Sequence, residues 1–212
     1  MSTKQALTEF HRGSILAAAG RLFMEKGTEK TTMDDIARAA EYSKATLYVY
    51  FQSKEEIINA ILLNGMILLK QKLHEAIADN RDWRQACEAL FLTLFRFCSE
   101  NPLTYSVATG ATALVQEGES PSKGVSDILR VHREIDEDME RFLKRGIAEG
   151  AVNPLFPPME IVLLFWSALA GLMRMAKVRE DYIQSTTGLG QEEFVRHGAH
   201  LLLSAIGAKT DE

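Results

Sequence analysis

The sequence predicts an all-α protein of about nine helices, with a three-helix N-terminal unit and a larger helical C-terminal domain. Apolar residues recur at the three- and four-residue spacing of amphipathic helices along most of the chain. The 212 residues include five prolines and no alternating run of β-branched residues that would indicate strands. Capping patterns then divide the chain into separate helices.

Two short helices joined by a tight turn are predicted within residues 31–54. Thr32 and Asp35 have the spacing of a capping box that opens the first helix, and Ser43 is placed to cap the second. Two short helices at a steep angle form a helix-turn-helix, whose second helix can enter the major groove of DNA. An ordinary helical hairpin with solvated polar residues would give the same pattern, so the spacing alone leaves both interpretations open.

The other helices are expected where apolar periodicity lies between capping and turn signals. A helix from Lys54 to about Asp79 begins beside the motif and should link the N-terminal unit mechanically to the C-terminal domain. Loops are expected over residues 1–11, 109–124 and 178–190. The remaining helices are predicted over about residues 10–26, 102–108, 125–149, 159–177 and 191–206, with one more capped by Asp82.

The amino-acid sequence of the N-terminal segment resembles that of the TetR family of bacterial transcriptional regulators. The matching segments are ILAAAGRLFMEKG, TTMDDIARAA and SKATLYVYFQSKEEII, within residues 15–58. The resemblance implies a helix-turn-helix DNA-binding domain over residues 8–68, with its motif at about 32–51. It also implies a helical ligand-binding and dimerisation domain over residues 80–207, where only the length and the all-helical pattern are similar.

The resemblance implies a ligand-responsive DNA-binding regulator. The expected protein is a homodimeric repressor that binds a palindromic operator and is released by a small apolar effector. The residues expected to reach phosphates or sugars are Thr32, Ser43, Thr46, Tyr50 and Lys54. Those expected to face base edges are Lys44, Ala45, Tyr48 and Val49.

Four positions depart from the family pattern. Glu41 stands in the turn where glycine is usual, so the turn is either mildly strained or differently shaped. Tyr42 replaces a smaller apolar residue. Ala45 and Val49 differ from the usual glycine and polar or aromatic residue on the reading surface, and they therefore affect base preference.

The segment 159–177 is more apolar than a surface helix of a monomer. Ser167 and Gly171, one turn apart, would let another helix approach closely. By resemblance, this helix and the last one form a dimer interface, whereas a central core helix is the alternative. The candidate interface residues are Ser167, Gly171, Phe194, Leu201 and Leu202.

A ligand cavity is expected among the fourth to eighth predicted helices. Methionines and aromatic residues suit an adaptable apolar pocket, although each candidate could equally be ordinary core packing. The candidates are Met66, Leu69, Phe91, Phe95, Tyr105, Trp166, Met173 and Met175.

The net charge of −5 is divided unevenly along the chain. Residues 1–54 carry eight Lys and Arg against six Asp and Glu, so basic charge gathers at the end with the motif, as contact with phosphates requires. The N-terminus has no signal-peptide pattern. The longest near-apolar run is 161–173, shorter than a bilayer needs, so we expect a cytoplasmic protein.

The sequence shows no catalytic or cofactor pattern. Cys87 and Cys98 lie three helical turns apart and are expected to be buried free thiols. His197 and His200 lack a third metal ligand, and His132 with Asp136 is interpreted as a surface ion pair. We therefore expect no metal, no cofactor and no enzymatic activity. The alternative is a helical small-molecule binding protein, or a cryptic enzyme, whose N-terminal motif is only scaffold.

Overall fold

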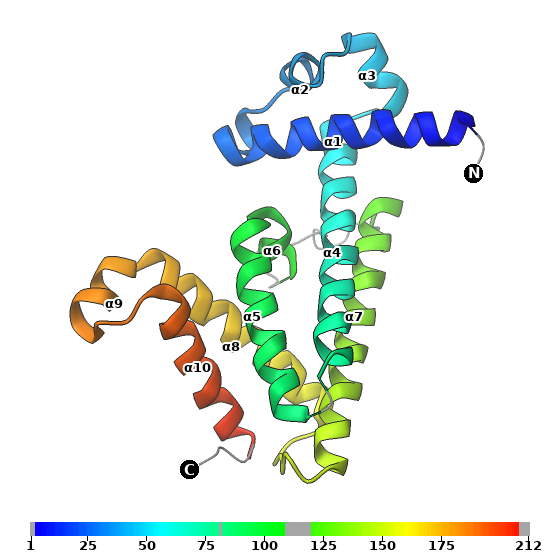
Figure 1. The fold of residues 1–212 in the computed structure, drawn as a ribbon. Coiled ribbons are helices and arrows are strands. Elements are labelled where there is room, and N and C mark those ends of the chain that lie inside the picture. The colour runs from blue at the N-terminus through cyan, green and yellow to red at the C-terminus, as the bar shows by residue number, and fades with distance from the viewer. Residues whose placement is uncertain (1–2, 81, 109–119, 208–212) are drawn as a thin grey trace. The chain divides into compact units, whose positions relative to one another are not determined.

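A computed structural model describes residues 3–80, 82–108 and 120–207, and within these ranges its regular secondary structure consists of α-helices joined by short connections (Figure 1). Ten helices are present there, which confirms the predicted fold class and adds one helix to the predicted number. They are α1 (Thr3–Lys30), α2 (Met33–Ala39), α3 (Lys44–Tyr50), α4 (Lys54–Ala78), α5 (Trp83–Glu100), α6 (Pro102–Ala108), α7 (Lys123–Ala148), α8 (Pro158–Val178), α9 (Glu180–Thr187) and α10 (Gln191–Ala205).

The chain divides into two compact units. The first consists of residues 1–64 with 120–128, and the second of residues 65–119 with 129–212. The helices α4 and α7 each contribute to both units. Because α4 is continuous across the boundary, it is a helical connection between the units and not a loop.

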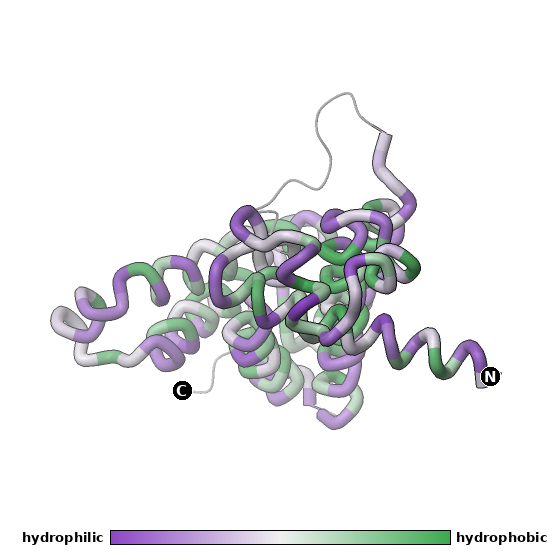
Figure 2. The backbone as a smooth tube through the Cα atoms, turned by 90° about the horizontal axis from the view of Figure 1, so that it is seen from above, coloured by the Kyte–Doolittle hydropathy of each residue, from purple (hydrophilic) through white to green (hydrophobic). Residues whose placement is uncertain are grey.

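In the first unit, α1, α2 and α3 pack on one another, and α2 and α3 lie on the same side of α1 in Figure 1. Each helix supplies an apolar stripe to a shared core, as the period of its sequence predicts. Hydrophilic and hydrophobic positions alternate along α1 near the end marked N in Figure 2. The core residues include Ile15, Ala19, Ile36, Leu47, Phe51 and Ile57, each fully buried.

The N-terminal stretch differs from the prediction. Residues 1–11 were expected to be loosely ordered, but α1 already begins at Thr3 and continues to Lys30. The helix does break at Gly27, as predicted: this residue has a non-helical φ of 81°, which glycine adopts without steric cost, and a short second helical piece follows it to Lys30. Thr31 holds the end of the helix, because its hydroxyl donates to the Gly27 carbonyl at 2.7 Å.

In the second unit, Trp83 anchors α5 to α7. Its indole Nε1 donates to the Phe142 carbonyl at 3.0 Å, and its ring stacks on the Phe142 ring with centroids 5.3 Å apart. Gly146 leaves room for this indole, since a Cβ there would overlap it. The helices α8 and α10 pack closely because Gly198 lies against the side chain of Leu172.

One predicted loop is partly helical. The range 178–190 contains α9, which ends at Gly188 in a left-handed conformation with a φ of 76°. The sequence concealed this helix because it has only eight residues and two nearby glycines. Of the loop predicted over 109–124, residues 109–119 lie outside the described part of the chain, and α7 begins at Lys123.

Candidate functional site

The N-terminus of α2 is closed by a complete capping box, as the sequence predicts. The Asp35 amide donates to the Thr32 hydroxyl at 3.1 Å, and the Thr32 amide donates to the Asp35 carboxylate at 3.0 Å. Lys26 of α1 also donates to this carboxylate at 2.7 Å. These bonds, that from Lys26 most of all, hold the pKa of Asp35 well below its usual range.

Serine 43 caps α3 as predicted. Its hydroxyl accepts from the Thr46 amide at 3.0 Å and shares a hydrogen bond with the Thr46 hydroxyl at 2.8 Å. Leu47 anchors the helix from below, because its side chain is fully buried. The cap and the buried leucine fix which side of α3 faces away from the core.

The turn between α2 and α3 contains a residue other than glycine in the left-handed conformation. Glu41 has a φ of 62° and is the one non-glycine residue with positive φ in the part of the chain that the structure describes. Backbone hydrogen bonds nevertheless hold the turn to the end of α2, since the Glu41 amide donates to the Arg38 carbonyl and the Tyr42 amide donates to the Ala37 carbonyl. The turn is therefore strained and not differently shaped.

Two side chains of α1 hold the turn and the end of α3. His11 Nδ1 and the Tyr42 hydroxyl lie 2.6 Å apart and share a hydrogen bond. Arg12 donates to the Tyr50 carbonyl at 2.6 Å and lies 4.0 Å from the centroid of the Phe51 ring. Sequence reasoning missed both residues, because the periodicity of α1 does not indicate which of its polar side chains reach another helix.

The outward side of α3 is a compact exposed surface. Val49 is 74% exposed and Tyr48 is 38% exposed, although both are large hydrophobic residues. Lys44 and Ala45 are exposed beside them, in the first turn of the helix. An exposed valine and tyrosine next to a small residue form a surface that can approach a base edge closely.

Both predicted cationic contacts already have partners. Lys44 lies 2.7 Å from the Asp34 carboxylate, and this hydrogen bond raises the pKa of Lys44. Lys54 donates to the Thr28 carbonyl at 2.8 Å, near the end of α1. Bound DNA would therefore have to compete with Asp34 for Lys44 and with a backbone carbonyl for Lys54.

The second unit contains a small apolar cavity of about 90 Å³. Its walls come from α5, α7, α8 and the end of α10. Of the predicted pocket residues, Phe91 and Trp166 line it. Lining residues that the sequence analysis did not select include Trp83, Cys87, Met139, Phe142, Phe165 and Leu203.

A second apolar void of about 10 Å³ is lined by three more of the predicted residues. Leu69, Tyr105 and Met173 line it, and Trp166 lines both spaces. The other candidates lie elsewhere: Met66 is fully buried without lining either space, Met175 is 48% exposed, and Phe95 lines neither.

A wider groove of about 300 Å³ lies between α4 and α7 within the second unit. Apolar side chains and charged residues such as Lys70, Arg141 and Asp138 line it together. These charges are paired, because Lys70 donates to Glu134 at 2.8 Å and Arg141 bonds Asp138. The groove is therefore a solvated helix–helix seam, as expected for a charged surface.

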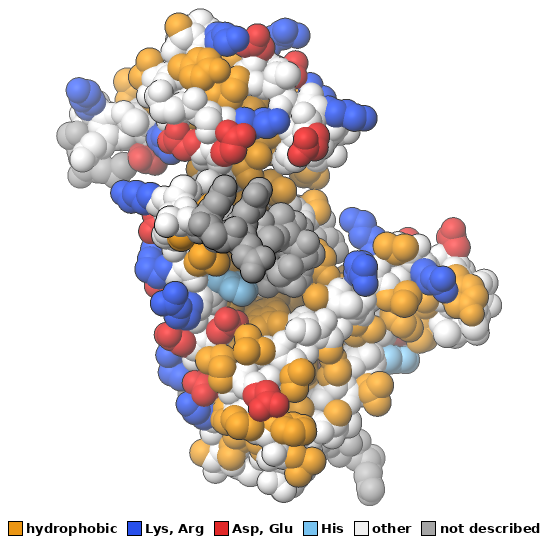
Figure 3. All heavy atoms as spheres, turned by 180° about the vertical axis from the view of Figure 1, so that it is seen from behind, with side chains coloured by type: hydrophobic (Ala, Val, Ile, Leu, Met, Phe, Trp, Pro, Cys, Tyr) orange, Lys and Arg blue, Asp and Glu red, His pale blue; other side chains and the backbone are white. Residues whose placement is uncertain are grey.

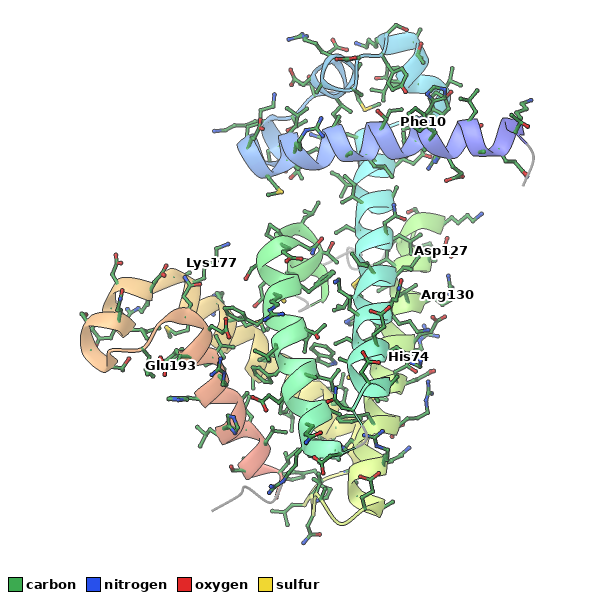
Figure 4. The ribbon with its side chains drawn as sticks, in the orientation of Figure 1. Phe10, His74, Asp127, Arg130, Lys177 and Glu193 are labelled. Atoms are coloured by element: carbon green, nitrogen blue, oxygen red, sulfur yellow. The ribbon has the colours of Figure 1, made fainter. Side chains whose placement is uncertain are left out.

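One side of α8 and α10 exposes apolar side chains, and hydrophobic atoms gather on the face of this unit that Figure 3 shows. Leu163, Leu164, Val178 and Leu201 are all more than half exposed. Gly171 has no atom within 4 Å of the position that a Cβ would occupy. Of the other predicted interface residues, Ser167 is exposed, whereas Phe194 and Leu202 are half-buried. Figure 4 labels Lys177, in the last turn of α8, and Glu193, in the first turn of α10.

The near-apolar run 161–173 lies within a longer helix than the sequence analysis considered. The helix α8 has 21 residues and is long and apolar enough by composition to cross a membrane. Core helices of soluble proteins meet the same test, so this one helix is weak evidence of a span.

The described residues contain no group of three His, Cys, Asp or Glu side chains that could hold a metal ion. Cys87 and Cys98 are free, and burial raises the pKa of each thiol to about 12. Thiols in this state are poor nucleophiles.

Among known protein families, a match is found for the N-terminal unit. The sequence model for bacterial regulatory proteins of the tetR family matches residues 15–61. The uncharacterised HTH-type transcriptional regulator YhgD of Bacillus subtilis is 26% identical over 144 residues, covering 68% of this chain and 72% of that protein. The HTH-type transcriptional repressor KstR2 of Rhodococcus jostii is 38% identical over 84 residues, covering 40% of this chain and only 41% of that protein.

The fold of the described chain is also similar to that of AibR. That structure, solved in complex with isovaleryl coenzyme A and operator DNA, has a TM-score of 0.66 over 94% of this chain and 100% of AibR. The identity is 18%, so this likeness concerns the fold.

Proposed function

Because this chain is a TetR-family protein with the family's N-terminal domain over residues 15–61, we propose that it is a ligand-responsive repressor of transcription. In this proposal a homodimer binds a palindromic operator through α3 and its symmetry mate, and a small apolar effector releases it. The observation that carries the proposal is the exposed side of α3, held in place by a cap, a buried leucine and two side chains of α1.

The DNA contacts divide into two groups. Lys44, Ala45, Tyr48 and Val49 face base edges, because they form the exposed side of α3. Thr32, Ser43, Thr46, Tyr50 and Lys54 contact phosphates or sugars around it. When Lys44 binds DNA, it must break its ion pair with Asp34. The free energy of the new Lys44–DNA contact is therefore partly offset by the loss of that ion pair.

The dimer forms through the exposed apolar side of α8 and α10. An open position at Gly171 allows close approach of a second helix, and the surrounding leucines supply the area that becomes buried. Covering this side also explains why a helix as apolar as α8 remains so exposed in a single copy. A dimer places two recognition helices at the spacing of successive major grooves, which a monomer cannot do.

The effector binds among α5, α7, α8 and α10. A cavity of about 90 Å³ is small beside the roughly 300–1,000 Å³ of most ligand pockets, so binding must favour a more open conformation. The helix α4 conveys the change, since it begins at the DNA-binding unit and its later turns pack in the second unit. Gly65 lies against Thr104 of α6 so closely that a Cβ would overlap it, which ties α6 to α4.

The repressive role rests on similarity to KstR2, and the pairing of an effector with an operator is supported by AibR. We propose that the protein acts in the cytoplasm, where its DNA is, and that it has no catalytic activity. A helical small-molecule binding protein with an inert N-terminal motif would share the cavity but would not discriminate between DNA sequences.

Equilibrium titration of DNA from the chain's own upstream region tests the proposal. We expect saturable binding that is at least about 1,000-fold tighter than to shuffled DNA of the same composition. Equal affinity for both fragments, or no binding, would favour the small-molecule binding protein.

A further inference from the structure

The two apolar spaces of the second unit follow one another along the same pair of helices. The larger space is lined by residues between 83 and 94 of α5 and between 161 and 166 of α8, together with α7 and α10. The smaller space is lined by residues between 94 and 98 of α5 and between 166 and 173 of α8, together with α4 and α6. At 1.5 Å per residue, the lining residues extend over about 18–22 Å of each helix. The two spaces therefore lie end to end.

Two side chains separate the spaces. Leu94 of α5 and Trp166 of α8 are the residues that the two linings share. Leu94 is 7% exposed and belongs to the core, whereas Trp166 is half-buried. Because packed cores yield little, Trp166 is the one of the two that can turn outward while the core stays in place.

The lining of both spaces favours an uncharged ligand. No charged side chain lines either space in the part of the chain that the structure describes. Two polar groups of the lining already have partners, because Trp83 Nε1 donates to the Phe142 carbonyl at 3.0 Å and the Tyr105 hydroxyl donates to the Ala170 carbonyl at 2.9 Å. A charged group would lose its hydration there without gaining a counterion, whereas a hydrocarbon surface is buried favourably.

The smaller space limits the shape of the ligand. Its volume of about 10 Å³ is close to that of one water-sized sphere. Leu69 and Leu169 line it, and each is 2% exposed, so neither can move aside without disturbing the core. A branched or cyclic group would overlap these side chains. A single unbranched chain is the shape that this space admits.

We propose that Trp166 is a movable wall between the two spaces, and that the effector carries an unbranched, uncharged hydrocarbon chain that fills both spaces once the indole turns outward. This inference rests on the proposed function, because it specifies the ligand class and a specificity-determining residue of the same site. The closed spaces are too small for most ligands, and the movement of one half-buried side chain opens them.

Titration of the full-length protein with two isomeric alcohols tests this inference. The linear 1-dodecanol and the branched 2-butyl-1-octanol have the same composition and one hydroxyl each, so they differ in shape. We expect 1-dodecanol to bind at least about tenfold more tightly, the factor that overpacking by a branch supplies. From 1-hexanol to 1-dodecanol, affinity should rise about fourfold for each added methylene. Equal affinity for the two isomers, or tighter binding of the branched one, would overturn the inference.

The position of the indole is measured by fluorescence. In Trp83→Phe, Trp166 is the remaining one of the two tryptophans. Saturation with 1-dodecanol should shift its emission to longer wavelength, because the indole turns toward water. The shorter 1-butanol, which cannot extend through both spaces, should cause no shift. If the variant fails to fold, acrylamide quenching of the unaltered protein gives the same comparison, since Trp83 is only 3% exposed. Bound 1-dodecanol with no change in either signal would overturn the role of Trp166.

A substitution then removes the wall. Trp166→Leu should join the two spaces, so 2-butyl-1-octanol should bind it at least about tenfold more tightly than it binds the wild type. Leu203→Ala is the matched control, because Leu203 lines the larger space alone and its loss leaves the wall in place. This control should keep the preference for 1-dodecanol. Unchanged discrimination by Trp166→Leu would overturn the assignment.

Operator release is measured separately, so the two proposals can fail independently. If 1-dodecanol binds with the expected preference but leaves operator affinity unchanged, the movable wall is supported and the ligand switch is contradicted. If 2-butyl-1-octanol releases the operator while 1-dodecanol does not bind, the wall is overturned and the switch is supported.

Discussion

His11 Nδ1 lies 2.6 Å from the Tyr42 hydroxyl, and this hydrogen bond joins α1 to the turn of the helix-turn-helix across 31 positions of the chain. The bonded turn is the one that contains the left-handed residue Glu41. The His11 ring also lies 5.5 Å, centroid to centroid, from the Tyr50 ring at the end of α3. The side chain of His11 therefore contacts the turn before α3 and the last residue of α3. The neighbouring Phe10, labelled in Figure 4, is exposed.

Tyr42→Phe tests this contact. Loss of the hydroxyl should lower the free energy of unfolding by about 1 kcal/mol, the usual net value of one hydrogen bond. Operator affinity should fall as well, because the turn that positions α3 loses its tie to α1. Urea denaturation and DNA titration measure the two effects. Tyr182→Phe, at an exposed position in the second unit, is the control, and equal effects of both variants would contradict the role of His11.

Glu41→Gly should stabilise the protein. A left-handed non-glycine residue costs about 1–2 kcal/mol, and the extra freedom of glycine in the unfolded chain offsets roughly half of that gain. The midpoint of thermal unfolding should therefore rise by a few degrees at most. Glu25→Gly, at an exposed position inside α1, should lower it instead. A lower midpoint for Glu41→Gly would show that the side chain contributes more than the backbone strain removes.

The Lys26–Asp35 pair predicts how the first unit responds to acid. The Asp35 pKa is lowered in the folded state from its ordinary 3.8, so the pair stabilises the fold above that pH and the stabilisation is lost as the pH falls below it. Asp35→Asn should therefore lose less stability than the wild type between about pH 6 and about pH 3. Urea midpoints at the two pH values measure this difference. Parallel losses in both proteins would mean that the pair does not persist in solution.

Gly171→Leu separates dimerisation from folding. The position is exposed and nothing lies within 4 Å of the added Cβ, so the fold of one subunit should tolerate the larger side chain. A close helix–helix contact should not tolerate it, so sedimentation should show monomers while the helical circular-dichroism signal is unchanged. Specific operator affinity should then be lost. A variant that still sediments as a dimer would place the interface elsewhere.

Features fixed by neighbouring residues could be predicted from the sequence. The capping box of Thr32 and Asp35, the cap by Ser43 and the buried Leu47 all depend on spacings of three or four residues, and the structure confirms them. The family pattern also drew attention to Glu41, whose unusual conformation the structure confirms.

Features that join distant segments could not be predicted in this way. Nothing local indicates that His11 reaches Tyr42, or that Gly146 makes room for Trp83. Met139 and Phe142 lie in the cavity wall, but the charged residues around them in α7 give no local sign of this. Their positions depend on how α7 is rotated against α5 and α8, which only tertiary packing decides.

The most direct test of the account is a comparison of operator affinity between the wild type and Val49→Glu. Val49 is 74% exposed on the outward side of α3, so the substitution should leave the fold intact while it places a negative charge against the DNA. Fluorescence anisotropy should show specific binding by the wild type, and binding at least about 100-fold weaker by the variant. Equal affinity of the two proteins for the operator would contradict the claim that α3 reads DNA.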